Sequence, residues 1–272
     1  MPKRESDRWR VAPGTKVHLD RIDPGSTEGA PGSKEETKAL LGELSDRTWD
    51  YQQKLYAEDK RSLLVVLQAI DAGGKDGTIS HVFRGLNPQG VSVSSFKAPT
   101  DEELAHDFLW RIHGATPAKR TVGVFNRSHY EDVLVVRVHE IVPEKVWRSR
   151  YARIREFEQN LADSGTEIVK LFLYISKDEQ AKRLQERITN PTKQWKFKLG
   201  DLEERKHWDE YMAAYEDAIT ETSTADAPWF VVPANRNWYR NWAVSTILLD
   251  TFAALDPKYP PPAEDLTNVV VE

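Results

Sequence analysis

Five short apolar runs are spaced along the chain, with longer stretches of mixed apolar and polar residues between them. The first run, 62–70, is apolar almost throughout, as is typical of a strand buried on both faces of a sheet. The others lie at 91–96, 121–125, 168–175 and 229–232. Because helix-like stretches separate the runs, the pattern predicts an α/β fold with a five-stranded parallel sheet.

Helical periodicity is present between and around these runs. The predicted helices span 34–59, 78–86, 101–113, 130–138, 143–163, 178–188, 201–222 and 236–255. Residues 11–34 are rich in Pro, Gly, Ser and charge, so we expect a loop or an arm there. We therefore interpret 1–272 as a single domain, with 1–60 as an N-terminal arm and helix.

Composition narrows the function classes. A formal net charge of -5 gives no general support for nucleic-acid binding, and the absence of cysteine excludes disulfides, thiolate nucleophiles and cysteine-ligated metal sites. No apolar run approaches the length of a membrane span or a signal core. We expect a cytoplasmic protein with neither nucleic acid nor membrane as a partner.

A phosphate-binding loop is predicted directly after the first apolar run. Gly73 and Gly74 let backbone N–H groups approach an anion, Lys75 supplies a point charge, and a helix start adds its positive end. The loop departs twice from the pattern G-x-x-x-x-G-K-[ST]: Ala69 replaces the first glycine, and Asp76 replaces the hydroxyl residue. The alternative is a tight turn with a solvated, exposed lysine.

The missing hydroxyl matters because that group normally contacts Mg²⁺. Asp71, at the end of the same strand, is the substitute ligand that we expect, since open parallel sheets place ligands at this edge. The alternative role for Asp71 is a turn cap.

A second polar cluster follows the run at 121–125. Asn126 stands where a magnesium-binding carboxylate is expected, and Glu131 could return a carboxylate to the same space. Arg127 suits a bidentate phosphate clamp. Ser128 and Glu131 could equally form a capping box and nothing more.

A third cluster is basic. Between Lys182 and Lys206 the chain has eight Lys or Arg and four acidic residues, in contrast to its negative total. Residues 182–208, between two predicted helices, therefore suggest a mobile lid that closes over phosphates. A basic surface loop is the alternative.

Together these clusters resemble the family-two polyphosphate kinases, over most of the chain from about Leu63 to Tyr239. The likeness rests on the stretches 71–78, 125–131, 190–196 and 229–234, the last followed by Trp238 and Tyr239. It implies a P-loop kinase-like three-layer α/β/α sandwich with a helical lid. It also implies phosphoryl transfer between inorganic polyphosphate and nucleotides with Mg²⁺ or Mn²⁺. Family members commonly have aspartate where Asn126 stands. In having asparagine there, the chain resembles the branch of the family that phosphorylates nucleoside monophosphates as well as diphosphates.

The predicted site follows from the clusters and the resemblance. Catalytic roles fall to Asp71, Lys75, Arg127 and Arg187, and the metal ligands to Asp71, Asn126 and Glu131. Predicted phosphate and polyphosphate contacts are Gly73, Gly74, Lys75, Asp76, Gly77, Thr78, Arg127, Lys193 and Lys196.

The predicted activity converts AMP or ADP to ATP at the expense of polyphosphate. The expected nucleotide substrates carry adenine or guanine, and we expect the protein to form a homo-oligomer. Two other functions fit the same loop: an ATP-dependent, thymidylate-like nucleoside monophosphate kinase, and an inactive nucleotide-binding regulatory module.

Overall fold

A computed structural model describes residues 4–267 and 269–271. Its centre is the predicted parallel sheet of five strands, and their order is β2-β3-β1-β4-β5. The strands are β1 (Ser62–Gln68), β2 (Val91–Ser95), β3 (Val122–Asn126), β4 (Thr166–Tyr174) and β5 (Trp229–Pro233). Every residue of β1 is buried, because this central strand has a neighbour on both sides and helices over both faces.

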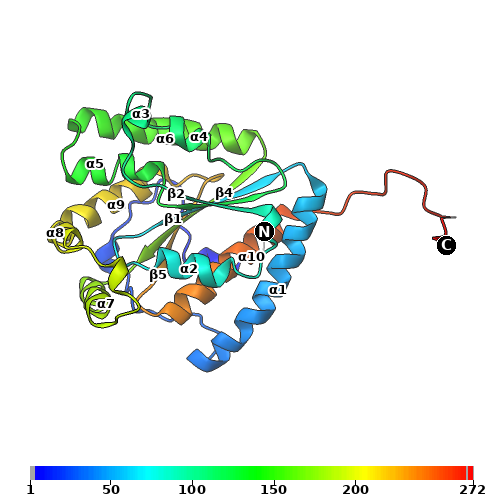
Figure 1. Cartoon of the computed structure of the whole chain (residues 1–272), viewed down its shortest axis with the longest axis horizontal. Helices are drawn as coiled ribbons and strands as arrows, with labels where there is room; N and C mark the ends of the chain where they lie inside the picture. The colour runs from blue at the N-terminus through cyan, green and yellow to red at the C-terminus, as the bar shows by residue number, and fades with distance from the viewer. Residues whose placement is uncertain (1–3, 268, 272) are drawn as a thin grey trace.

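Helices cover both faces of the sheet, which makes three layers (Figure 1). One layer contains α6 (Glu144–Asp163) and α9 (Trp208–Thr222). The other contains α1 (Lys34–Glu58), α2 (Lys75–Val82) and α10 (Asn237–Leu255). The predicted α/β/α sandwich is therefore confirmed.

Two further helices, α7 (Lys177–Thr189) and α8 (Gly200–Lys206), lie beside the sheet with the turn η5 (Gln194–Lys196) between them. The remaining 3₁₀ turns are η1 (Glu5–Arg8), η2 (Leu19–Arg21), η3 (Pro88–Gly90) and η4 (His129–Asp132). No helix among the described residues is both long and apolar enough to span a bilayer.

Three predicted helices were wrong in their continuity. The stretch 101–113 is divided into α3 (Asp101–Leu104) and α4 (Trp110–His113), because the Asp107 side chain accepts a hydrogen bond from the Leu109 N–H and so forms a turn. The stretch 130–138 contains η4 and the single turn α5 (Val135–Val138), in a region rich in β-branched valines that disfavour helix. The stretch 201–222 breaks at His207, between α8 and α9.

The N-terminal arm lies along the outer edge of β5. The Val11 N–H donates to the Trp229 carbonyl and the Val231 N–H donates to the Trp9 carbonyl, so the arm adds a short antiparallel bridge to an edge strand. The predicted loop at 11–34 otherwise contains one 3₁₀ turn, η2, and leads into α1. Ser33 and Glu36 form the capping box at which α1 begins.

A charged group lies inside the apolar core. The Lys170 side chain of β4 is fully buried, and its ammonium donates to Glu158 at 2.6 Å, to the Tyr130 hydroxyl at 2.9 Å and to the Thr222 carbonyl at 2.7 Å. Glu158 also accepts from the Tyr130 hydroxyl and contacts His129. All three ammonium donors are therefore satisfied, and the network joins β4, α6, α9 and η4.

Candidate active site

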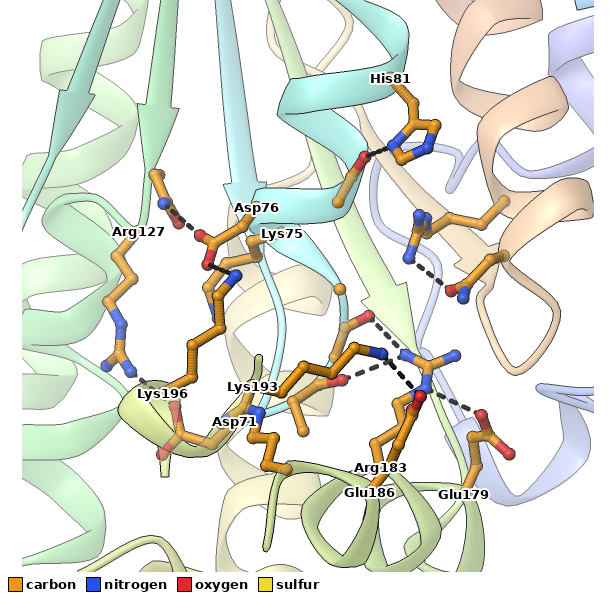
Figure 2. Close-up of a pocket in the computed structure, with 18 of the residues that line it drawn as sticks. Asp71, Lys75, Asp76, His81, Arg127, Glu179, Arg183, Glu186, Lys193 and Lys196 are labelled. Atoms are coloured by element: carbon orange, nitrogen blue, oxygen red, sulfur yellow. Dashed lines mark hydrogen bonds and ion pairs between the residues drawn. The ribbon is translucent and has the colours of Figure 1, made fainter. Parts of the chain in front are cut away.

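A cavity of about 800 Å³ opens at the carboxyl edge of the sheet. Its lining comes from the loop after β1, the ends of β2 and β3, helix α7, the turn η5 and the start of α10. Open parallel sheets bind ligands at this edge, so the predicted position of the site agrees with the observed cavity. Figure 2 shows Lys75 and Asp76 between Arg127 on one side of the cavity and Arg183 on the other.

The loop after β1 has the backbone of an anion cradle. Ala72 has φ +61° and Gly74 has φ +106°, both left-handed. Gly74 is the N-cap of α2 and offers no side chain, so the first N–H groups of the helix are free to meet an anion. A Cβ on Gly73 would lie 2.5 Å from the Ala69 Cβ, which explains why glycine is needed at 73 when alanine occupies 69.

Lys75 is buried, with 9% of its surface exposed, which corrects the expectation of an exposed loop lysine. Its ammonium donates to the Ala69 carbonyl at 2.7 Å. Burial, and then the nearby Arg127 charge, lower the pKa of Lys75 to about 8. A solvated lysine on a plain turn is therefore excluded, and the group is held where an anion would restore its charge.

Arg127 lies between two carboxylates and has a left-handed backbone, with φ +63°. One terminal nitrogen donates to Asp71 at 2.7 Å and the other to Glu131 at 3.1 Å. The charge of Glu131 and then that of Asp71 hold the pKa of Arg127 above its usual range. The Oδ1 atom of Asp71 therefore forms an ion pair with Arg127 and does not cap a turn.

The capping-box alternative for Ser128 and Glu131 was wrong. The Ser128 hydroxyl accepts from the Tyr130 N–H, whereas the Glu131 carboxylate turns to Arg127. Glu131 does not line the cavity, and neither does Thr78, whose buried hydroxyl donates to the Gly74 carbonyl at 3.1 Å.

Asp71 and Asn126, two of the predicted metal ligands, both line the cavity and carry oxygen atoms of the kind that hard cations prefer. Asn126 lines the cavity, and its amide nitrogen donates to Asp76. The amide oxygen of Asn126 takes no part in that hydrogen bond. Two effects raise the pKa of Asp201, on α8. The larger is the burial of Asp201, and the second is the nearby negative charge of Asp71. Carboxylate and amide oxygens are the donors that Mg²⁺ prefers, and mutual repulsion between carboxylates favours a cation beside them.

The lid candidates reach the cavity but are paired with acids. Lys193 contacts Glu186 at 2.6 Å, and Lys196 contacts Asp76 at 3.6 Å. Arg187 contacts Asp201 at 3.3 Å. All three basic residues line the cavity with the glycine loop, so the structure brings the first and third sequence clusters together.

Two arginines of the cavity were missed by the sequence reasoning. Arg183, on α7, donates to the carbonyls of Ala72 and Gly73 and pairs with Glu179. It lies one helical turn before Arg187, so the i, i+4 spacing could have identified it. Arg240, on α10, is buried beside the loop, and no local pattern indicates it.

Comparison with known proteins assigns the family. The model of the family described as "Polyphosphate kinase 2 (PPK2)" matches residues 32–260. The chain belongs to the polyphosphate kinase 2 family. It is 56% identical over 265 residues to an AMP/ADP-polyphosphate phosphotransferase of Meiothermus ruber, covering 97% of this chain and 99% of that one.

Two further relatives agree. An ADP-polyphosphate phosphotransferase of Rhodopseudomonas palustris is 46% identical, with 95% of this chain and 93% of that one covered. The crystal structure of polyphosphate kinase 2 from Arthrobacter aurescens matches with a TM-score of 0.93 at 48% identity, covering 97% and 94%. The resemblance identified from the sequence motifs is confirmed by these matches.

Proposed function

We propose that this polyphosphate kinase 2 family member transfers phosphoryl groups between inorganic polyphosphate and nucleoside mono- or diphosphates, converting AMP or ADP to ATP. The observation that carries the proposal is the convergence of the glycine loop, Lys75, Arg127 and the basic segment on one cavity. The names of the relatives favour polyphosphate over ATP as the donor. They also favour both acceptors, since the relative at 56% identity is named for AMP and ADP.

The residues act by position and charge. In the direction of ATP synthesis, an oxygen of the nucleotide phosphate attacks the terminal phosphorus of polyphosphate, and the bond to the bridging oxygen breaks. In each transfer the chain leaves one phosphate shorter, and no covalent bond to the protein forms. One transfer converts ADP to ATP, and two successive transfers convert AMP to ATP. The loop N–H groups and Lys75 stabilise negative charge on the transferred group, as phosphoryl transfer requires.

Arg127 can bind phosphate while it keeps its carboxylate partners. Each terminal nitrogen gives one N–H to Asp71 or Glu131, which leaves a second N–H on each for a phosphate oxygen. A cation at Asp71 would compete for that carboxylate and release a further N–H toward the substrate.

Magnesium is the metal that the oxygen donors suit. Asp71 and Asn126 would hold it, with Glu131 reaching it only if its contact with Arg127 opens. The ion would neutralise phosphate charge and orient the reacting oxygens.

The segment 182–208 would act as the lid. Closure exchanges the contact between Arg187 and Asp201 for one with the transferred phosphoryl group, and the two lysines grip the polymer. Trp195 and Leu199 are 76% and 78% exposed, so the turn carries apolar surface that closure could bury.

One assay tests the function. Purified protein is incubated with Mg²⁺ and polyphosphate plus either AMP or ADP, and ATP formation is measured, with Lys75→Ala as the control. ATP from both acceptors is expected, and turnover that requires ATP as the donor would contradict the proposal. GMP and GDP in the same assay, and light scattering of the free protein, test the predicted guanine acceptors and homo-oligomer.

A further inference from the structure

Arg240 is a buried cation whose hydrogen-bonding capacity is only partly used. Its side chain lies in the first turn of α10, with 3% of the residue exposed. The guanidinium donates from Nη1 to Asn237 at 2.9 Å, and from Nε and Nη2 to Asn241 at 3.2 and 2.8 Å. A guanidinium has five N–H donors, so one donor on each terminal nitrogen has no protein acceptor among the described residues.

Arg240 and Lys75 differ in one respect from the half-buried cations of the cavity. Within the described chain, Lys75 and Arg240 alone among the cations of the cavity are both buried and free of any carboxylate within 4.0 Å. Burial, and then the charge of Arg183, lower the pKa of Arg240 to about 10. A buried, uncompensated guanidinium destabilises a folded protein, so its presence at a cavity wall indicates an anionic partner.

The position of Arg240 relative to the glycine loop identifies which anion. A Cβ added to Gly74 would lie 2.2 Å from Nη1, and one added to Gly77 would lie 3.2 Å from Nη2. The fork therefore rests against the first turn of α2, where free N–H groups already favour negative charge. In phosphotransferases with such a loop, the loop cradles the phosphates of the donor.

We propose that Arg240, oriented by Asn237 and Asn241, binds a phosphate of the polyphosphate donor on the α10 side of the glycine loop. This inference rests on the proposed function for the identity of the donor. Two parallel N–H groups match two phosphate oxygens, which a lysine could not do in the same geometry. The nucleotide acceptor then occupies the side of Asn126 and Arg127.

The first experiment measures binding without turnover. Inorganic tripolyphosphate, in the absence of Mg²⁺, is titrated into the free protein, into Arg240→Gln and into the control Arg236→Gln, which alters an exposed arginine at the N-cap of the same helix. We expect the Kd of tripolyphosphate to rise about 10- to 100-fold for Arg240→Gln, as for a lost hydrogen bond to a charged group, and to be unchanged for the control.

Thermal unfolding separates this role from a structural one. Without ligand, Arg240→Gln should unfold at the same temperature as the wild type or higher, because it removes an uncompensated buried charge. Saturating tripolyphosphate should raise the Tm of the wild type more than that of the variant at equal concentration. A lower ligand-free Tm together with unchanged tripolyphosphate affinity would make Arg240 a packing residue and overturn the proposal.

Kinetics then decides between donor and acceptor. Arg240→Gln should raise the KM for polyphosphate and leave the KM for ADP unchanged, and Arg240→Lys should recover only part of the loss. A raised KM for ADP alone would overturn the assignment to the donor.

If the wild type binds tripolyphosphate through Arg240 but forms no ATP, the proposed function fails while the phosphate site stands. If the wild type does not bind tripolyphosphate, the site itself is refuted.

Discussion

Replacing Lys170 with methionine tests the buried network under the active site. The substitution keeps the volume of the side chain but removes three hydrogen bonds and leaves Glu158, which is 1% exposed, without its cation. Breaking a buried ion pair on one side typically costs about 3–5 kcal/mol of the free energy of unfolding. For a chain of this length, a loss of that size lowers the Tm by roughly 5–9 °C.

The assay is equilibrium unfolding in urea at pH 7, followed by far-UV circular dichroism. Adding Glu158→Gln to the first substitution removes the uncompensated charge, so the double variant should regain much of the lost stability. Arg153→Met is the matched control, because its contact with Glu156 is exposed and should contribute little to stability.

The direction in which stability changes with pH is a second, independent test of the network. Burial raises the pKa of Glu158, but the charge of Lys170 and the hydrogen bond of His129 outweigh it, so the pKa lies below the ordinary value. The stability that Glu158 contributes is therefore present above its unfolded pKa and is lost as the pH falls through the folded one. Without Lys170 the folded pKa rises, so the deficit of Lys170→Met should shrink between pH 7 and pH 5. A single variant as stable as the wild type, or a deficit that grows in acid, would refute this reasoning.

Lys75→Ala should abolish ATP formation while circular dichroism and Tm stay near those of the wild type; normal kcat would remove the loop from the mechanism. Because its pKa is about 8, Lys75 loses its charge in the free protein above that pH, so kcat/KM should fall there, and a flat profile to pH 9 would contradict this. Asn126→Asp should retain activity in a Mg²⁺ titration and Asn126→Ala should lose it, whereas equal activities would exclude Asn126 as a ligand. Arg187→Ala should mainly lower kcat, by roughly 10³-fold, and Lys193→Ala or Lys196→Ala should raise the KM for polyphosphate at low salt. Silent substitutions at these three positions would disprove the lid.

The sheet and the glycine loop could be predicted because their causes are local. A strand buried on both faces needs an unbroken apolar run, and the run from Leu63 to Leu67 meets that need. The cavity followed from the same runs, since parallel strands bring their carboxyl ends to one edge. Helix continuity was less predictable because single turns, such as the one at Asp107, interrupt an otherwise helical pattern.

The pairing inside the site could not be predicted because it depends on distant residues. Arg127 meets Asp71 across 56 positions, and this contact takes one N–H of the guanidinium that the sequence assigned to phosphate. Lys75 is buried because the cavity wall forms around it from several elements, which the sequence of the loop alone does not indicate. Arg240 reaches the loop only because α10 packs against α2.

The arm beside β5 sets an order for folding during synthesis. Its backbone contacts join Trp9 and Val11 to residues at 229–231, and the Ser6 N–H donates to Asp250, 244 positions later. A ribosome therefore releases Trp9 and Val11 long before residues 229–231 exist, and the arm stays unpaired until they have emerged. Once β5 has formed, its outer edge is open until the arm pairs with it, and in that interval chaperone capture or pairing with another chain competes with the arm.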